Sequence, residues 1–464
     1  MLIAGYNLTK VDTLRPVLIN WLAGALIVAA AISVWLALYQ WFLQPSNIWI
    51  ADLPPNARPF ANLSQPNQLA TLLSMGLASV LFFYEKHLLN RISSSLLALL
   101  LLFGIALTQS RTPWLMTIFF ICVWLWKFNS AHRRLPRSWA LAWVAVFVGF
   151  IFILPYLAQW LQLGETTSVA ERAQAMERWD LYVQFYQAVL HGPLWGYGWQ
   201  QVSTAQLAIT PLFPVAIYTE YTHNILLDLL IWNGPILGTV IIVAVAYYLL
   251  RLAVLARSVE NLFVLLAVGF FLVHSMLEYP HAYAYFLLPV GLLIGCLQAD
   301  FPCKTWRIPR WSVLVFLIGS VGLYAVIWQE YRLIEEDYRL MRFEKNRVGT
   351  LKAEQPAPDV ILLTQLQALT KHSRLPATTD MSAAELDELS RFAKRFTHPA
   401  AMFKYAQALA LNNQLEQAYQ QLLLIQGLHG DRLLQEAIDE LGRLEEQHPE
   451  IAPLLQRLHV LLAD

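Results

Sequence analysis

The feature that most constrains this chain is a series of long apolar stretches without a single Asp, Glu, Lys or Arg. A helix needs about 20 apolar residues to cross a bilayer. The chain has 464 residues, of which 57% are hydrophobic and only 14% charged, too apolar a composition for a soluble protein of this length. It therefore predicts an all-α polytopic membrane protein. About nine charge-free windows are the predicted spans: Val17–Leu38, Asn62–Tyr84, Ile92–Ser110, Thr112–Trp126, Ser138–Leu163, Leu229–Leu250, Asn261–Leu277, Tyr279–Ala299 and Trp311–Trp328.

The chemistry changes at Glu330. The last 135 residues hold 15 Lys+Arg and 20 Asp+Glu, and their apolar residues recur at helical spacing. This pattern predicts a transmembrane domain over residues 1–329 and a soluble helical domain over 330–464. The spacing of Ala, Leu and Tyr from Ala400 to Gln426 is typical of one tetratricopeptide-type helix pair.

Positive charge in the short loops predicts the orientation of the spans. With the N-terminus inside, thirteen of the seventeen Lys and Arg in residues 1–329 fall in cytoplasmic loops, which retain positive charge. An odd number of spans then places the soluble tail outside. The long loop of residues 164–222 also lies outside, and its length and its Trp and Tyr content predict an ordered, functional segment.

Several general classes find no support in the residues. Formal net charge is zero and no basic stripe is present, so nucleic-acid binding is not indicated. The three cysteines imply no disulfide framework. No phosphate-binding glycine loop, zinc spacing or other soluble-enzyme motif occurs.

Polar residues from distant parts of the chain collect where predicted spans meet the outer face. Such residues are costly in a membrane and are functional candidates by default. Two arginines suit a pyrophosphate leaving group, because guanidinium groups bind phosphate oxygens bidentately. A neutral histidine can accept the proton of an attacking hydroxyl. The segments are Gln65-Pro-Asn67, Thr108-Gln-Ser-Arg111, Arg178, His223-Asn224 and His274-Ser-Met-Leu-Glu-Tyr-Pro280. His281, by contrast, is predicted to be a surface or interfacial-belt residue.

At these residues the sequence resembles the O-antigen ligase and polymerase superfamily, and within it the bacterial O-oligosaccharyltransferases, the PglL-type protein glycosylation ligases. The resemblance covers roughly Arg58 to Gly295 in the family's order. Its five stretches are Arg58–Thr71, Thr108–Arg111, Arg178-Trp179 with Gly192–Gly198, His223-Asn224 with Asn233–Gly238, and His274–Pro280.

The resemblance implies a GT-C-like membrane glycosyltransferase that uses an undecaprenyl-pyrophosphate-linked oligosaccharide and no nucleotide sugar. It implies a bacterial inner-membrane location, with the site and the C-terminal domain in the periplasm. Relatives have further spans before the Gln-Pro-Asn segment, where this chain has one, which predicts an N-terminally shortened copy. The implied roles are catalytic for His223, pyrophosphate-binding for Arg111 and Arg178, and substrate-positioning for Gln65, Asn67, Asn224, His274, Glu278 and Tyr279.

The resulting hypothesis is metal-independent and cofactor-free transfer of the glycan to a Ser or Thr hydroxyl of a protein such as pilin. Two alternatives stay open at this point. One is the same chemistry on lipid A-core or on a growing glycan chain, as in O-antigen ligases and polymerases. The other, from a different class, is a transporter of lipid-linked sugars or a membrane scaffold. Neither the glycan, the acceptor nor the oligomeric state follows from the sequence.

Overall fold

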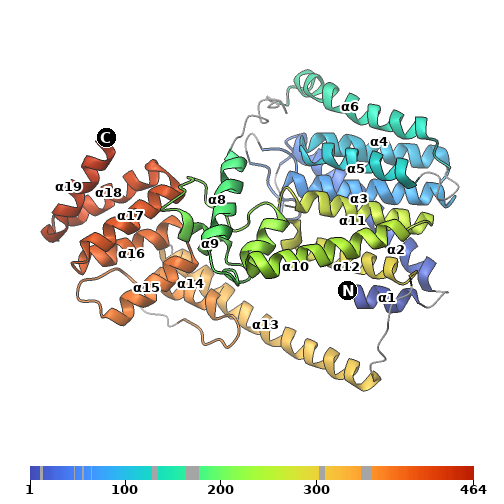
Figure 1. Cartoon of the computed structure of the whole chain (residues 1–464). Helices are drawn as coiled ribbons and strands as arrows, with labels where there is room; N and C mark the ends of the chain where they lie inside the picture. Colours follow the sequence, from blue (N-terminus) through green and yellow to red (C-terminus); the bar gives the residue numbers. More distant parts are fainter. Residues whose placement is uncertain are drawn as a thin grey trace. The chain divides into compact units, whose positions relative to one another are not determined.

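The structure is a computed structural model that describes residues 1–10, 14–45, 47–54, 57–63, 65–127, 134–163, 177–301, 309–345 and 357–463. In these residues the secondary structure is helical, apart from one isolated bridge between Asn47 and Ile50. The chain divides into two compact units (Figure 1). The first comprises Met1–Met176, Tyr221–Leu229 and Leu237–Cys303, and the second Glu177–Glu220, Leu230–Ile236 and Lys304–Asp464.

The first unit is a bundle of apolar helices. It contains α1 (Leu2–Thr9), α2 (Leu14–Trp41), α3 (Pro66–Glu85), α4 (Arg91–Leu107), α5 (Thr112–Lys127), α6 (Arg137–Trp160), most of α10 (Ile225–Leu255), α11 (Val259–Ser275), the 3₁₀ turn η2 (Pro280–Ala282) and α12 (Ala284–Gln298).

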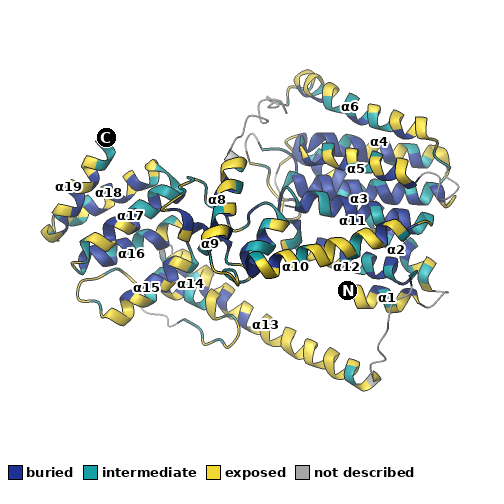
Figure 2. Cartoon of the chain, viewed as in Figure 1, coloured by how far each residue is buried: buried dark blue, intermediate teal, exposed yellow. Residues whose placement is uncertain are grey.

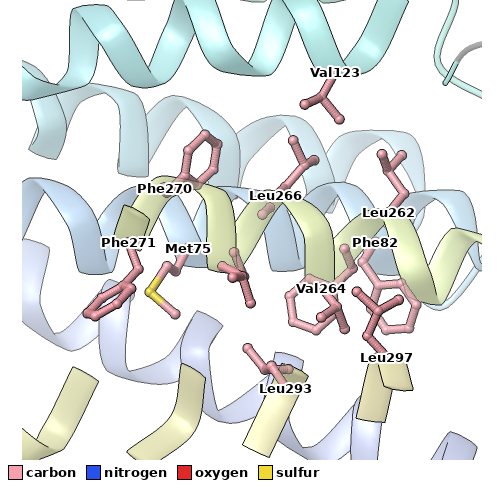
Figure 3. Close-up of a cluster of buried hydrophobic side chains, with 14 of the residues drawn as sticks. Met75, Phe82, Val123, Leu262, Val264, Leu266, Phe270, Phe271, Leu293 and Leu297 are labelled. Carbon is pink, nitrogen blue, oxygen red and sulfur yellow. The ribbon is translucent and has the colours of Figure 1, made fainter. Parts of the chain in front are cut away.

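Helix α3 is the most buried of the long apolar helices, and it packs against α2, α4, α5 and α11. Small side chains allow this close packing. A Cβ on Gly76, for example, would lie 2.5 Å from the Cβ of Ala30 in α2. The hydroxyls of Ser74 and Ser79 donate to backbone carbonyls one turn earlier, so they can be buried without other partners. Figure 3 shows the core around α3 and α11, including Met75 and Phe82.

Other apolar helices leave large hydrophobic side chains on the surface (Figure 2). Helix α6 shows Phe152 and Ile153, and α13 (Arg310–Lys345) shows Phe316 and Val321. A bilayer covers such faces in a membrane protein. The chain is accordingly a multi-pass membrane protein. Five of its described helices are long and apolar enough to cross a membrane, and four shorter apolar helices cover the remaining predicted windows, so the count of nine spans stays a prediction.

The second unit contains α8 (Glu177–His191), α9 (Val202–Ile209), α13 and a group of C-terminal helices. Helix α13 is continuous through position 330, so the predicted boundary at residues 329 and 330 falls inside a helix. The C-terminal helices are α14 (Thr364–Arg374), α15 (Ala383–Arg395), α16 (Pro399–Leu411), α17 (Leu415–His429), α18 (Asp431–Glu445), η3 (Pro449–Ile451) and α19 (Ala452–Ala463).

The predicted helix pair is present as α16 and α17, which pack together; its tetratricopeptide-type assignment stays a prediction. The segment after α9 packs on this group. The Tyr218 ring lies 5.4 Å from the ring of His398 and 5.5 Å from that of His429, and His429 is bonded to the carbonyl of Thr397. Burial raises the pKa of Tyr218 to about 12 and lowers the pKa of His429. The long loop and the C-terminal helices therefore share one compact unit.

Candidate active site

Four segments of the first unit converge at one end of the bundle. Local sequence explains each position. Pro66 is the first residue of α3, where its missing N–H costs nothing. Asn224 caps α10, because its Oδ1 accepts from the backbone N–H of Leu226 at 2.9 Å. His223 precedes this cap with a positive φ of 59°. The remaining two segments are the turn after α4, which contains Gln109 at φ 46°, and the residues that follow α11.

The centre of the site is a histidine bonded to a buried carboxylate. His223 Nδ1 lies 2.6 Å from Glu278 Oε2, and the Glu278 side chain is only 1% exposed. Asn67 Nδ2 donates to the other carboxylate oxygen, Oε1, at 3.1 Å. Ser110 Oγ in turn donates to Asn67 Oδ1. The sequence predicts Asn67, His223 and Glu278 at one membrane level. In the structure all three are linked by hydrogen bonds.

An aromatic wall flanks His223. The ring of Tyr279 lies 5.2 Å from the imidazole, edge to face, and stacks on Tyr221 at 4.7 Å with an interplanar angle of 10°. Tyr283 continues the stack at 6.2 Å from Tyr279. Aromatic faces beside polar groups are surfaces on which ligands stack. Tyr279 was expected here from the sequence, whereas Tyr221 was not.

A second histidine–carboxylate pair supports the loop that carries His223. His281 Nε2 lies 3.1 Å from Asp228 Oδ2, and the backbone N–H of Thr222 donates to Asp228 Oδ1 at 2.9 Å. Asp228 is fully buried and His281 is 11% exposed. The prediction that His281 is a surface or belt residue is therefore wrong, because η2 turns this side chain inward onto Asp228. Sequence reasoning also missed Asp228, although an acidic residue in the first turn of an apolar helix is a usable signal.

His274 and Gln65 occupy different environments within this region. His274 is fully buried, and its Nδ1 lies 2.8 Å from Thr71 Oγ1 in α3. Gln65 is the N-cap residue of α3 and is half-buried. Asn224, besides capping α10, donates from Nδ2 to the carbonyl of Met276 at 3.2 Å, which joins the His223 loop to the end of α11. The substrate-positioning roles of these residues stay predictions.

The predicted phosphate-binding arginines belong to different units. Arg111 is exposed at the start of α5 in the first unit, and no described carboxylate is within ion-pair distance of it. Arg58 donates from Nη1 to the carbonyl of Gln109 at 3.2 Å and so fixes the turn that precedes Arg111. Arg178, half-buried near the start of α8, belongs to the second unit, and its joint action with Arg111 stays a prediction.

The segment of residues 196–199 in the long loop packs against the backbone and side chains of residues 231–234. The backbone N–H of Tyr197 donates to the carbonyl of Ile231 at 2.8 Å, and the Trp199 ring stacks on Trp232 at 4.8 Å. This close approach requires glycine on both sides. Gly196 and Gly234 have φ of 77° and 76°, and a Cβ on Gly234 would lie 2.0 Å from the carbonyl oxygen of Leu194.

Comparison with known proteins gives a consistent result. Residues 59–83 match the family model described as protein glycosylation ligase, residues 96–243 match O-antigen ligase, and residues 262–440 match the C-terminal part of a virulence factor membrane-bound polymerase. A general O-oligosaccharyltransferase of Acinetobacter baylyi is 32% identical over 437 residues, which is 92% of this chain and 76% of the relative.

A ComP-specific O-oligosaccharyltransferase of the same organism is 31% identical over 286 residues. That match covers 61% of this chain and 52% of the relative, so the chain matches about half the length of this second protein. No solved structure matches the chain. The three matched regions together include the central site residues, which are Asn67, Ser110, His223, Asp228, Glu278, Tyr279 and His281.

Proposed function

Because the chain belongs to the bacterial O-oligosaccharyltransferase family, within the wider group of O-antigen ligases, we propose that it transfers an oligosaccharide from undecaprenyl-pyrophosphate to a Ser or Thr hydroxyl of a pilin-type protein. It is a membrane glycosyltransferase, and its relatives support protein O-glycosylation. The proposed site of transfer is the periplasmic face of the inner membrane. The Lys and Arg distribution between predicted loops supports this orientation.

The observation that carries the proposal is the bond from His223 Nδ1 to buried Glu278. A carboxylate can only accept a hydrogen bond, so it holds the proton on Nδ1 and leaves the lone pair on Nε2. A histidine held in this tautomer is suited to act as a general base. In the proposed reaction Nε2 accepts the proton of the acceptor hydroxyl.

The bond changes of the proposed reaction are simple. The acceptor Oγ forms a bond to the first carbon of the sugar as the bond from that carbon to the pyrophosphate oxygen breaks. The pyrophosphate leaves with the electron pair, and His223 holds the hydroxyl proton. The guanidinium group of Arg111 stabilises the negative charge on the leaving group, with Arg178 as its predicted second cation. In this proposal the charge is neutralised by arginine, so the reaction needs no metal.

The aromatic wall is proposed to bind the sugar. Tyr279 and Tyr221 present stacked rings next to His223, which is where a sugar ring must lie for its first carbon to meet the acceptor hydroxyl. Gln65, at the N-terminus of α3, is the proposed hydrogen-bonding group for sugar or acceptor. Asn224 binds the protein through both polar groups of its side chain, so its proposed contribution to substrate positioning is to hold the loop that carries His223.

The test is transfer by the purified protein from an undecaprenyl-pyrophosphate oligosaccharide to a pilin acceptor, in the presence of EDTA and measured by intact mass. We expect the parent to add the glycan and His223→Ala to lose at least about 100-fold in rate. His459→Ala is the matched control, because His459 is an exposed histidine of α19. Equal transfer by His223→Ala and the parent refutes the proposed role of His223, whereas no transfer by either protein favours the scaffold alternative.

One alternative acceptor has a specific observation in its favour. The O-antigen ligase and polymerase models match residues 96–243 and 262–440, which are longer segments than the glycosylation-ligase match at residues 59–83. The same assay with lipid A-core as acceptor separates the two. Transfer to lipid A-core but not to pilin makes the chain an O-antigen ligase with the same proton transfer.

A further inference from the structure

Three buried side chains connect the turn before Arg111 to the proposed general base. Ser110 Oγ donates to Asn67 Oδ1, Asn67 Nδ2 donates to Glu278 Oε1 at 3.1 Å, and His223 Nδ1 lies 2.6 Å from Glu278 Oε2. Ser110 is 4% exposed, Asn67 9% and Glu278 1%. The residues come from the turn after α4, the first turn of α3, the segment that follows α11 and the loop before α10. This series of hydrogen bonds therefore joins four segments of the first unit.

The donor and the acceptor of each hydrogen bond in this series can be assigned in only one way. The Glu278 carboxylate can only accept, so Asn67 must present its NH₂ group to it. The Asn67 carbonyl then faces Ser110, and the Ser110 hydroxyl must be the donor. Each group thus fixes the orientation of the next, and burial strengthens every bond because water does not compete.

We infer that Asn67 is a positioning residue that ties the Ser110–Arg111 turn to the His223–Glu278 pair, so that the donor-binding and proton-accepting parts of the site are held as one unit. This inference rests on the proposed function. It changes the role expected for Asn67 from its sequence, because both polar groups of its side chain bind the protein rather than sugar or acceptor.

The turn at the far end of the chain is fixed from a second side. Arg58 Nη1 donates to the carbonyl of Gln109 at 3.2 Å, while Ser110 is bonded to Asn67. Arg111 follows directly, so its backbone position depends on both contacts. Loss of Asn67 removes the link between this turn and Glu278 and takes one hydrogen-bond donor from a buried carboxylate, which is costly.

The experiment compares Asn67→Ala, Asn67→Asp and Ser110→Ala in the full-length protein, with kcat, donor KM and the pH profile of kcat/KM as readouts. Ser74→Ala is the matched control, because Ser74 is a buried α3 serine that donates only to the carbonyl of Ala70. For Asn67→Ala we expect kcat to fall about 10-fold to 100-fold, as for loss of a hydrogen bond to a charged group. Ser110→Ala should lose less, and Ser74→Ala nothing.

The pH profile separates positioning from a merely structural role. Among the described residues, Glu278 and Tyr279 contact His223 directly. Tyr221 lies behind Tyr279, and the Asp228–His281 pair lies next to Tyr221. Asn67→Ala removes the hydrogen bond that Asn67 donates to Glu278, so the carboxylate charge acts more strongly on His223 and favours its protonated form. The acidic limb of the profile should therefore move to higher pH in Asn67→Ala and stay in place in Ser74→Ala. In Asn67→Asp the two carboxyl groups share one proton, which restores a donor to Glu278, so the shift should be smaller than in Asn67→Ala.

The double variant Ser110→Ala with Asn67→Ala tests the link itself. If the two residues act in one chain, the double variant loses no more activity than Asn67→Ala alone. Full additivity of the two losses overturns the inference. So does Asn67→Ala with parental kcat and a raised KM for donor or acceptor, since that result makes Asn67 a direct substrate contact.

Misfolding and failure of the proposed function remain distinguishable from these outcomes. Thermal unfolding in detergent identifies a variant that does not fold, and in that case Ser110→Ala, which removes only a hydroxyl, decides the inference by its kcat and pH profile. An inactive parent refutes the proposed function, and a fully active His223→Ala refutes the proposed role of His223, whatever the Asn67 variants do. A His223-dependent parent with unaffected Asn67 and Ser110 variants refutes this inference alone.

Discussion

Replacement of Glu278 by Gln changes one atom of the site and makes a sharp prediction. Gln has the same shape as Glu but presents one carbonyl oxygen and one NH₂ group. Asn67 donates to the Oε1 position from its Nδ2, so the Gln carbonyl must lie there. The Gln NH₂ group then faces His223 Nδ1, which has to become the acceptor. The proton of the imidazole moves to Nε2, the nitrogen that is proposed to receive the acceptor proton.

The expected loss follows from this wrong tautomer. A general base contributes about 10²-fold to 10⁴-fold to a rate, and the corresponding Asp→Asn change in the serine protease triad costs about 10⁴-fold. The His223–Glu278 distance is 2.6 Å and Glu278 is only 1% exposed, so bulk water does not compete for the carboxylate side of this bond. We therefore expect kcat to fall by about 10²-fold to 10⁴-fold, or about 3 to 5 kcal/mol in activation free energy. Donor KM should change little, because Arg111 is untouched.

The assay is initial-rate glycan transfer by purified protein, resolved into kcat and donor KM, with a matched Glu→Gln control away from the site. Glu260→Gln makes the same chemical change in the first turn of α11, where Glu260 pairs with Lys86 at 2.6 Å. That variant should keep the parental kcat. If Glu278→Gln folds normally and loses less than about threefold in kcat, the orienting role of Glu278 is refuted.

Three further results are expected from other parts of the molecule. Arg111→Ala should raise donor KM at least about tenfold with EDTA present or absent, as measured with purified lipid-linked donor, because a charge-assisted phosphate contact is lost. Gly234→Ala should lower the free energy of unfolding by about 2 to 4 kcal/mol, because φ is 76° and the new Cβ would meet the Leu194 carbonyl. A lower thermal unfolding temperature of the protein in detergent is the measurement. Acidification below pH 6.5 should destabilise the protein, because burial lowers the pKa of His429 in the folded state and its contribution, present above that pH, is lost as pH falls. Unfolding at pH 8 and pH 5 should show a smaller difference in His429→Gln than in the parent.

Much of the helical architecture was accessible from residue patterns alone. Each of the nine charge-free windows falls on an apolar helix, because an apolar run of this length has no alternative that satisfies its backbone groups in a membrane. The pattern could not show which helices lie at the centre. Helix α3 is central because Gly76 and its small neighbours admit α2 closely, a property of facing surfaces rather than of one segment.

The site was predicted as a set of residues but not as a set of bonds. Asn67, His223 and Glu278 were placed at one membrane level from their positions at span ends. That the three are bonded in this order, with Ser110 at one end, depends on the register of four elements. His281 is the plainest example of a contact that the sequence could not predict. Its sequence surroundings are those of an aromatic belt, and only the turn of η2 brings it onto Asp228.

The sequence by itself determined that the chain is a helical membrane protein, that its charged final third differs from the rest, and that His223, Arg111 and Glu278 are candidates for its chemistry. These follow from hydrophobicity, charge and residue type, which are properties of single positions and short segments. The tertiary structure alone decided that Glu278 binds His223 and that Asn67 faces Glu278. Such pairings link residues about 50 to 210 positions apart, so they are set by helix packing rather than by any local pattern.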